Sequence, residues 1–250
     1  MNYYNPMRIL VFISKHTGLA MLESLKNIPD DYLFVVGPKD SSLIEQSLNS
    51  NGFEFMKVEA FCSQDFLPES FDWLINLWGS HIFSANEIQL ARQSLNIHPS
   101  YLPHSKGSDP VLWSQLNGFP QGVTLHAITH QLDSGPIYVR QIVNTPLISA
   151  GKDNYEVVIN ACITLFADAW PDIRIGVIKP FHPDDVEDSK PNNRSGTLSH
   201  QTREYDRFDD SQKDLMSWLM AYNYGPDFLP KISFNGIEYK LNLTVHKDSN

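Results

Sequence analysis

The sequence predicts an α/β protein with an open, mostly parallel β-sheet and flanking helices, followed by a small C-terminal helix and β-hairpin. Apolar runs alternate with helical patterns through the first half of the chain. The runs are continuous rather than alternating, as in strands covered on both faces. After about residue 180 the composition becomes polar and rich in Pro and Asn. We therefore expect a core domain over residues 1–180 and an extension, containing a linker, a helix and a hairpin, over 181–250.

The first half of the chain supplies the elements of the parallel sheet. Apolar runs predict strands at 8–13, 32–37, 53–59 and 71–79. Helical patterns follow the first two strands, one over 19–28 that ends near Pro29 and one over 38–49 that stops at Asn51-Gly52. In open α/β sheets, ligands bind at the carboxyl ends of the strands.

The second half adds further strands and helices. Helical patterns occupy 85–93, 109–118, 153–178 and 211–221. We expect Asp109 to cap the second of these helices and Trp170-Pro171 to break the third. Strands are predicted at 122–130 and 137–143, joined by a tight turn, and a hairpin turns at Asn235-Gly236.

Composition narrows the function class. The formal net charge is −10, which disfavours a nucleic-acid binder, and no apolar run approaches the length of a membrane span. A cytoplasmic protein without a membrane partner is expected.

The two cysteines, Cys62 and Cys162, show no zinc-site or disulfide spacing. On one strand, His126 and His130 would lie about 13 Å apart, too far for one ion, so we expect no metal.

Asn96 and His98 are the strongest candidates for chemistry. Residues two apart on a strand project from one face, and Pro99 stops this strand directly after His98. Acyl transfer to an amine creates an oxyanion and releases a proton. An amide donor can hold the oxyanion and an imidazole can handle the proton. Asp133 could orient that imidazole. Taken alone, each residue also has a structural interpretation. Asn96 could be a strand-end cap, His98 a hydrogen-bonded histidine and Asp133 an ordinary Asp in a turn.

Together, these residues carry a resemblance to a known family. The stretch Asn96-Ile97-His98-Pro99-Ser100-Tyr101-Leu102-Pro103, then Gly122-Val123-Thr124-Leu125-His126 and Leu132-Asp133-Ser134-Gly135, resembles the core of the folate-dependent formyltransferases, over roughly residues 7–180. The resemblance implies a Rossmann-like open α/β fold. It further implies that Asn96, His98 and Asp133 are catalytic and that 10-formyltetrahydrofolate is the formyl donor.

The resemblance also implies where the folate binds. In the family, backbone groups after the fourth strand and before the catalytic Asp hold the pterin, which here are Leu77, Trp78, Gly79, Ala127, Ile128, Thr129, His130 and Leu132. Trp78 could form a wall of the folate pocket, although a Trp after an apolar strand is also typical of a core.

Segments after the core resemble the nucleotide-sugar branch of the family. Pro103, Gly107, Pro110 and Trp113 match a Pro-x-x-x-Gly-x-x-Pro-x-x-Trp pattern of that branch, and the region from Thr197 to Asp206 resembles its motif after the core. A nucleoside diphosphate needs cations for its phosphates and a flat surface for its base. The candidate substrate residues are Lys15, Lys106, Gly107, Trp113, His200, Arg203 and Tyr222. The alternatives are that the cations are solvated surface residues and that Trp113 belongs to the core.

The expected acceptor is dTDP-4-amino-4,6-dideoxyglucose, for O-antigen or other surface polysaccharide synthesis. Three other acceptors stay open: a dTDP-3-amino sugar, a GDP-amino sugar and methionyl-tRNA. A non-catalytic protein that binds folate or a nucleotide sugar is the alternative of a different class. The terminal hairpin could form a homodimer contact through its apolar face.

Overall fold

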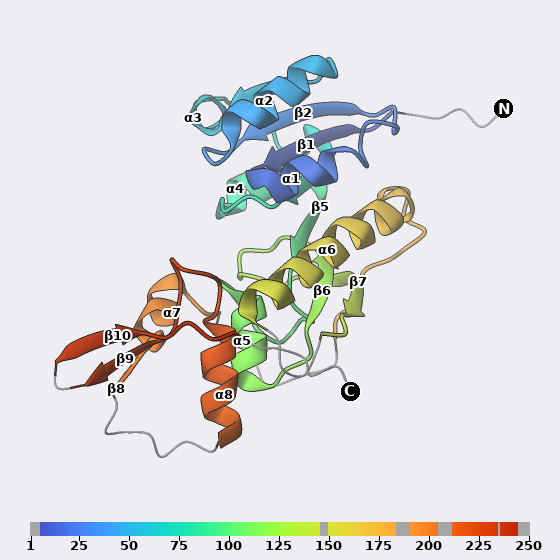
Figure 1. Ribbon diagram of the computed structural model, residues 1–250. Coiled ribbons are helices and arrows are strands. Elements are labelled where there is room, and N and C mark those ends of the chain that lie inside the picture. The colour runs from blue at the N-terminus through green and yellow to red at the C-terminus, as the bar shows by residue number, and fades with distance from the viewer. Residues whose placement is uncertain (1–5, 146–149, 184–190, 205–211, 235, 245–250) are drawn as a thin grey trace. The chain divides into compact units, whose positions relative to one another are not determined.

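The computed structural model describes residues 6–145, 150–183, 191–204, 212–234 and 236–244 (Figure 1). Within these ranges the chain forms a seven-stranded sheet with flanking helices and a separate three-stranded sheet. The predicted α/β class, with a mostly parallel sheet, is confirmed. Within the described residues, no helix combines the length and the apolar character needed to cross a membrane.

The chain forms two compact units that alternate along the sequence. Unit 1 comprises Met1–His98, Thr124–Arg140 and Cys162–Asp184, and unit 2 comprises Pro99–Val123, Gln141–Ala161 and Asp185–Asn250. This division differs from the boundary expected at residue 180. Segments from the middle of the chain pack with the C-terminal part, as in the contact between α5 (Pro110–Asn117) and α8 (Gln212–Ala221).

The large sheet has the strand order β3-β2-β1-β4-β5-β6-β7. Its strands are β1 (Arg8–Ile13), β2 (Asp31–Val36), β3 (Glu54–Lys57), β4 (Phe71–Leu77), β5 (Ala91–His98), β6 (Gly122–His126) and β7 (Ile137–Ile142). Strands β1 to β5 pair in parallel, and β6 runs antiparallel to β5. The strand order reverses between β1 and β4, which is where open α/β sheets place their ligands.

Of the remaining helices, the first four connect strands β1 to β5 along the chain, and the last two follow β7. They are α1 (Lys15–Leu22), α2 (Ser41–Ser50), α3 (Val58–Phe61), α4 (Ala85–Ile88), α6 (Gly151–Arg174) and α7 (Arg194–His200). On one side of the unit 1 sheet, buried apolar side chains form a core from Leu10, Phe12, Val35, Phe61, Phe71 and Leu74. Their burial stabilises strands β1, β2 and β4.

Several predicted boundaries are wrong because tertiary pairing overrides local pattern. The helix expected at 85–93 ends at Ile88, and Ala91 and Gln93 pair with β4 instead. The first helix ends at Leu22, the third strand ends at Lys57, and the strand expected over 122–130 ends at His126. A ten-residue loop, not a tight turn, therefore joins β6 to β7.

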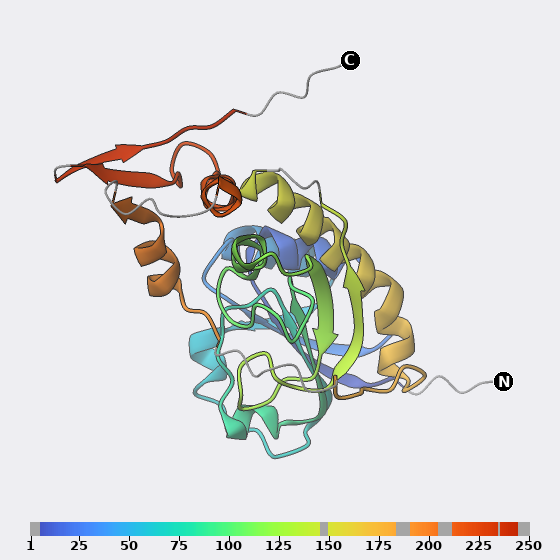
Figure 2. The ribbon, with the colours of Figure 1, turned by 90° about the horizontal axis from the view of Figure 1, so that it is seen from below.

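Two predicted helix features are also wrong. Pro171 does not break α6, which Figure 2 shows as one continuous helix. Its neighbours Trp170 and Ile173 are fully buried, and this packing outweighs the low helix propensity of proline. Asp109 precedes α5 in a left-handed conformation (φ 54°) and its side chain makes no capping hydrogen bond.

Unit 2 contains the predicted C-terminal helix and hairpin. Trp218 and Ala221 of helix α8, and Tyr222 directly after it, form a core with Leu112 of α5. Strands β9 (Lys231–Phe234) and β10 (Ile237–Lys240) form the antiparallel hairpin, whose residue Asn235 lies outside the described residues. The expected linker also contains α7, and the short strand β8 (Thr202–Glu204) follows it and pairs in parallel with β9.

Candidate active site

Polar side chains form a row across three neighbouring strands of unit 1. Asn76, next to last in β4, is paired in register with Asn96 of β5. Asn96 is in turn paired with His126, the last residue of β6. Residues at matched register on neighbouring strands have adjacent side chains. The row therefore places two amides and an imidazole at one edge of the sheet.

The structure brings the three predicted catalytic residues together. Nδ2 of Asn96 donates a hydrogen bond to Oδ1 of Asp133 at 3.4 Å. Nδ1 of His98 lies 3.5 Å from Oδ2 of Asp133, and both side chains are more than nine-tenths buried. A buried carboxylate beside an imidazole favours the charged form of the ring.

Asp133 reaches this position on the loop that joins β6 to β7. It adopts a left-handed backbone conformation (φ 49°), which is strained for a residue other than glycine and is enriched at functional sites. The loop is closed by a hydrogen bond from Ala127 N to Pro136 O at 2.8 Å. A Cβ at Gly135 would lie 1.9 Å from the Ala127 carbonyl oxygen, so only glycine permits this closure.

Two further residues of the cluster were missed by sequence reasoning. Asn76 donates from Nδ2 to Oδ1 of Asn96 at 2.9 Å. Nε2 of His126 lies 3.1 Å from Nδ2 of Asn96 and 3.5 Å from Oδ1 of Asp133. The available signal was an Asn inside an otherwise apolar strand, but the pairing register was needed to place it beside Asn96.

The premise used to reject a metal site was wrong, because His130 lies beyond the end of β6. Among the described residues, no group of three or more His, Cys, Asp or Glu side chains could hold a metal ion.

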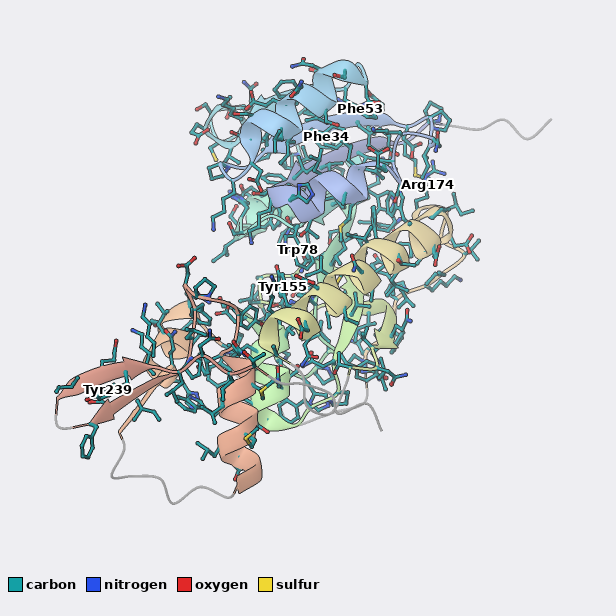
Figure 3. The ribbon with its side chains drawn as sticks, in the orientation of Figure 1. Phe34, Phe53, Trp78, Tyr155, Arg174 and Tyr239 are labelled. Atoms are coloured by element: carbon teal, nitrogen blue, oxygen red, sulfur yellow. The ribbon has the colours of Figure 1, made fainter. Side chains whose placement is uncertain are left out.

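A cavity of about 70 Å³, open to solvent, adjoins the cluster. Its lining residues are Asn76, His81, Ile82, Phe83, Asn96, His126, Ile128, Thr129, His130, Leu132 and Asp133. Four of the predicted folate residues are among them, namely Ile128, Thr129, His130 and Leu132. Leu77, Trp78, Gly79 and Ala127 do not line it. Trp78 is buried, which agrees with the alternative that it belongs to the core (Figure 3). Its backbone has φ 65°. His81, Ile82 and Phe83 were not foreseen.

A second cavity of unit 1 lies at the carboxyl ends of β1, β2 and β4, where the strand order reverses. It measures about 200 Å³ and includes Ser14, Gly37, Gly79, Ser80 and His81 among its lining residues. Lys15 follows Ser14 but is not among them. His81 therefore lines this cavity as well as the one beside the cluster.

A hydrogen-bonded contact with Glu87 fixes the orientation of His81. Its Nε2 lies 2.8 Å from Oε1 of Glu87. The other carboxylate oxygen of Glu87 accepts hydrogen bonds from Ser84 N and Ser84 Oγ, both at 2.7 Å. Burial acts to raise the pKa of Glu87, but the hydrogen bonds from Ser84 and the contact with His81 lower it on balance. Glu87 is thus held in its charged form.

In unit 2, three predicted substrate residues do come together, but as a packed cluster. Nε1 of Trp113 donates to Thr197 Oγ1 at 3.1 Å, and the Trp113 and His200 rings are 5.6 Å apart. The Tyr222 hydroxyl donates to the Thr197 carbonyl at 2.9 Å, and its side chain is fully buried. Tyr222 therefore offers no surface on which a base could stack, and that prediction is wrong.

The other predicted substrate residues of unit 2 lie near Asn192. Lys106 is buried, and its carbonyl accepts a hydrogen bond from Asn192 N at 2.9 Å. Gly107 has φ 85°, and a Cβ there would lie 2.2 Å from the Asn192 carbonyl oxygen. Gly107 thus permits a close backbone contact. The side chain of Arg203 lies outside the described residues.

Unit 2 also contains a largely apolar cavity of about 250 Å³. Asp109, Arg194, Tyr155, Tyr224 and Phe228 are among its lining residues. The Arg194 guanidinium lies 4.8 Å from the centre of the Phe228 ring and pairs with Oδ1 of Asp109 at 2.8 Å. Burial, and then the nearby Tyr155, raise the pKa of Tyr224 and keep its phenol neutral.

Comparisons with known proteins agree with this geometry. Residues 78–161 match the family described as formyl transferase. A 75-residue segment, 30% of this chain, is 34% identical to dTDP-4-amino-4,6-dideoxyglucose formyltransferase of Mycobacterium bovis. That match spans 32% of the curated relative's length.

Solved structures share the fold over nearly the whole chain. A 4-N formyltransferase from Francisella tularensis has a TM-score of 0.80 at 18% identity, covering 96% of this chain and 98% of that one. An N-formyltransferase from Helicobacter canadensis, in complex with folinic acid and dTDP-3-aminofucose, has a TM-score of 0.74 at 18% identity, covering 93% and 85%. Residues 78–161 are therefore similar to the formyl transferase family, and the chain shares the fold of solved sugar N-formyltransferases.

Proposed function

We propose that this chain transfers the formyl group of 10-formyltetrahydrofolate to the amino group of a nucleotide-linked amino sugar. The observation that carries the proposal is the cluster of Asn96, His98 and Asp133. Asp133 lies within 3.5 Å of both other side chains, beside an open cavity. An amide donor, an imidazole and a buried carboxylate are the groups that acyl transfer to an amine requires.

The cavity beside the cluster fits the formyl donor. Ile82, Phe83, Ile128 and Leu132 give it apolar walls, while Asn96 and Asp133 provide a polar end. A pterin is a flat ring with polar edges, so apolar walls can hold its faces and backbone groups its edges. Bound folate would supply the formyl carbon at this polar end.

The side chains of the cluster then have distinct tasks. Nδ2 of Asn96 donates to the acyl oxygen as negative charge develops on it, and the protonated His98 ring adds positive charge nearby. Asp133 stabilises the charged His98 ring and assists the movement of the amine's proton toward the leaving folate nitrogen. A bond forms between the amine nitrogen and the formyl carbon, and the bond from that carbon to the folate nitrogen breaks. The proton lost by the amine ends on the folate nitrogen.

The proposed acceptor is a dTDP-linked amino-dideoxy sugar, with dTDP-4-amino-4,6-dideoxyglucose as the first candidate, used in surface polysaccharide synthesis. The name of the curated relative supports the 4-amino sugar. The Helicobacter canadensis relative was solved with dTDP-3-aminofucose, which supports a 3-amino sugar as the second candidate. The Pro103 to Trp113 motif is consistent with either.

We also propose a homodimer formed through the terminal hairpin. Phe234, Ile237 and Tyr239 are each about half exposed there. Figure 3 shows Tyr239 on this hairpin. Paired apolar side chains on an exposed hairpin are stabilised by burial against a second copy. Sedimentation of the wild type and of an Ile237→Lys variant checks this, since the dimer should dissociate in the variant.

The function is tested by incubating the protein with 10-formyltetrahydrofolate and a panel of amino sugar nucleotides, and following the mass of the product.

The variants Asn96→Ala, His98→Asn and Asp133→Asn should each lower kcat by about 10²–10⁴-fold. His182→Asn and Asp72→Asn are matched controls outside the cluster and the predicted substrate residues, and they should keep the wild-type rate. Near wild-type rates in folded cluster variants would remove the assignment. Folate binding without product across the panel would favour a non-catalytic binder.

A further inference from the structure

The row of Asn76, Asn96 and His126 forms one hydrogen-bonded chain that runs in a single direction. Each side chain accepts from one neighbour and donates to the next, and both ends of the chain are backbone groups. The first is the Gly79 amide, which lies on the loop after β4. The last is the Ala127 carbonyl, on the loop after β6. All of these residues belong to unit 1.

The direction is determined at the Gly79 end. A backbone N–H can only donate, and Gly79 N lies 2.9 Å from Oδ1 of Asn76. The other terminal atom of Asn76 is therefore nitrogen, and it donates to Asn96 at 2.9 Å. The atom of Asn96 that accepts must be its oxygen. Nδ2 of Asn96 is consequently turned toward His126 and Asp133.

The other end requires the same direction. A backbone carbonyl can only accept, and Ala127 O lies 2.8 Å from Nδ1 of His126. Nδ1 therefore carries the hydrogen, and in the neutral ring Nε2 is an acceptor. Nε2 lies 3.1 Å from Nδ2 of Asn96, which donates to it. Two backbone groups, on separate loops, thus agree on one orientation of the Asn96 amide.

We propose that Asn76 is a positioning residue, which acts with His126 to present Nδ2 of Asn96, rather than its oxygen, to the acyl oxygen. This inference rests on the proposed function. If Asn96 turned over, its nitrogen would face the nitrogen of Asn76 and its oxygen would face the Asp133 carboxylate. Asn76 is 7% exposed, so little water can compensate for such a mismatch. Chains of aligned hydrogen bonds also polarise one another and strengthen the donor.

The chain has a second consequence for the folate loops. Gly79 and Ala127 lie on the two loops to which the family resemblance assigns the pterin. A Cβ at Gly79 would lie 2.4 Å from Oδ1 of Asn76, so the contact depends on glycine at that position. The side chain that contacts the acyl oxygen is therefore aligned by the two backbone segments that flank the donor site.

Two substitutions of Asn76 separate positioning from packing. Asn76→Asp keeps the side-chain volume but replaces the donor with an acceptor, so Asn96 should turn its nitrogen toward the new carboxylate. Asn76→Ala removes volume and leaves His126 and Asp133 to hold Asn96 as before. We expect kcat at pH 8 to fall by about 10²-fold in Asn76→Asp and by less than about 10-fold in Asn76→Ala. A residue that only fills space predicts the opposite order.

Acidification provides a further check. Protonation of the new carboxyl restores a donor toward Asn96, so the kcat of Asn76→Asp relative to wild type should rise as the pH falls. The matched control is Asn154→Asp in unit 2. Asn154 is 2% exposed and also donates from Nδ2 to an amide oxygen, that of Gln115 at 3.0 Å. Its kcat should stay within about twofold of wild type, with no recovery in acid.

A measurement without substrate keeps this inference distinct from the proposed function. Nitrogen NMR of histidine-labelled protein, with the His126 signals assigned through His126→Asn, reports which ring nitrogen is protonated. Wild type and Asn76→Ala should show hydrogen on Nδ1 alone, whereas Asn76→Asp should show it on Nε2. Hydrogen on Nε2 in wild type, or no change in Asn76→Asp, would overturn the positioning role. Absence of product from wild type with these tautomers intact would overturn the proposed function instead.

Discussion

Asp133 is the residue on which the cluster converges. Its carboxylate lies within 3.5 Å of Asn96, His98 and His126, which come from two strands of the sheet. A carboxylate can accept several hydrogen bonds, so one side chain can orient the Asn96 amide and the His98 imidazole together. The strained backbone at Asp133 and the need for glycine at position 135 follow from holding that carboxylate in place.

A buried ion pair away from the cluster allows a stability prediction at the same scale. Arg174 donates from Nε and Nη2 to the two carboxylate oxygens of Asp30, at 2.9 and 2.6 Å, and the pair is at most 6% exposed (Figure 3). Arg174→Met leaves the Asp30 charge buried without its cation. We expect urea unfolding to show a loss of about 3–5 kcal/mol.

The matched control is Lys152→Met, which removes an exposed pair with Glu156 at 3.8 Å. It should change the free energy of unfolding by less than about 1 kcal/mol. A loss of similar size in both variants would show that burial of the Arg174–Asp30 pair is not what makes it stabilising.

Among the elements, helix α6 contains a proline that its packing tolerates. Pro171 is exposed, lacks an amide hydrogen and lies inside the helix, where proline costs about 3 kcal/mol relative to alanine. Pro171→Ala should therefore raise the free energy of unfolding by up to about 3 kcal/mol and raise Tm. Calorimetry of this variant beside Asp172→Ala, an exposed neighbour expected to change little, checks it. An unchanged or lower Tm would contradict the argument.

Helix α4 depends on its capping box, in which Ser84 and Glu87 bond each other's backbone amides. The folded state holds the pKa of Glu87 below its usual value of 4.5. The stabilisation from the charged form is therefore complete above about pH 4.5 and is lost as the pH falls through the lowered pKa. Chemical unfolding should show Glu87→Gln less stable than wild type at pH 7, with the difference shrinking below pH 4.5. A difference that stays constant with pH would exclude the carboxylate as its source.

For the whole molecule, net charge bears on the choice of acceptor. A protein with a net charge of −10 is repelled by the phosphates of a tRNA, and only a local basic surface could overcome this. Fluorescence anisotropy should therefore detect no binding of tRNA up to about 10 μM at physiological salt. Binding that weakened steeply with salt would restore methionyl-tRNA as an acceptor.

Much of the sheet follows from local pattern. The runs at 8–13 and 71–77 are apolar because these strands are buried on both faces, and this property is visible in one dimension. Asn96 and His98 were likewise found from a two-residue spacing before a proline. Asp133 was predicted from its residue type and from the family resemblance.

Strand register, side-chain packing and the alternation of the chain between the two units could not be predicted from local sequence pattern. Asn76 and His126 are 20 and 30 positions from Asn96, and only strand pairing makes them neighbours. The burial of Tyr222, the continuity of α6 through Pro171 and the alternation of the two units depend on contacts between distant segments. A linear pattern records whether a residue is apolar and how often such residues recur. The neighbour of a polar side chain is determined only when the strands pair, because the stabilising free energy comes from contacts between residues that are far apart in the sequence.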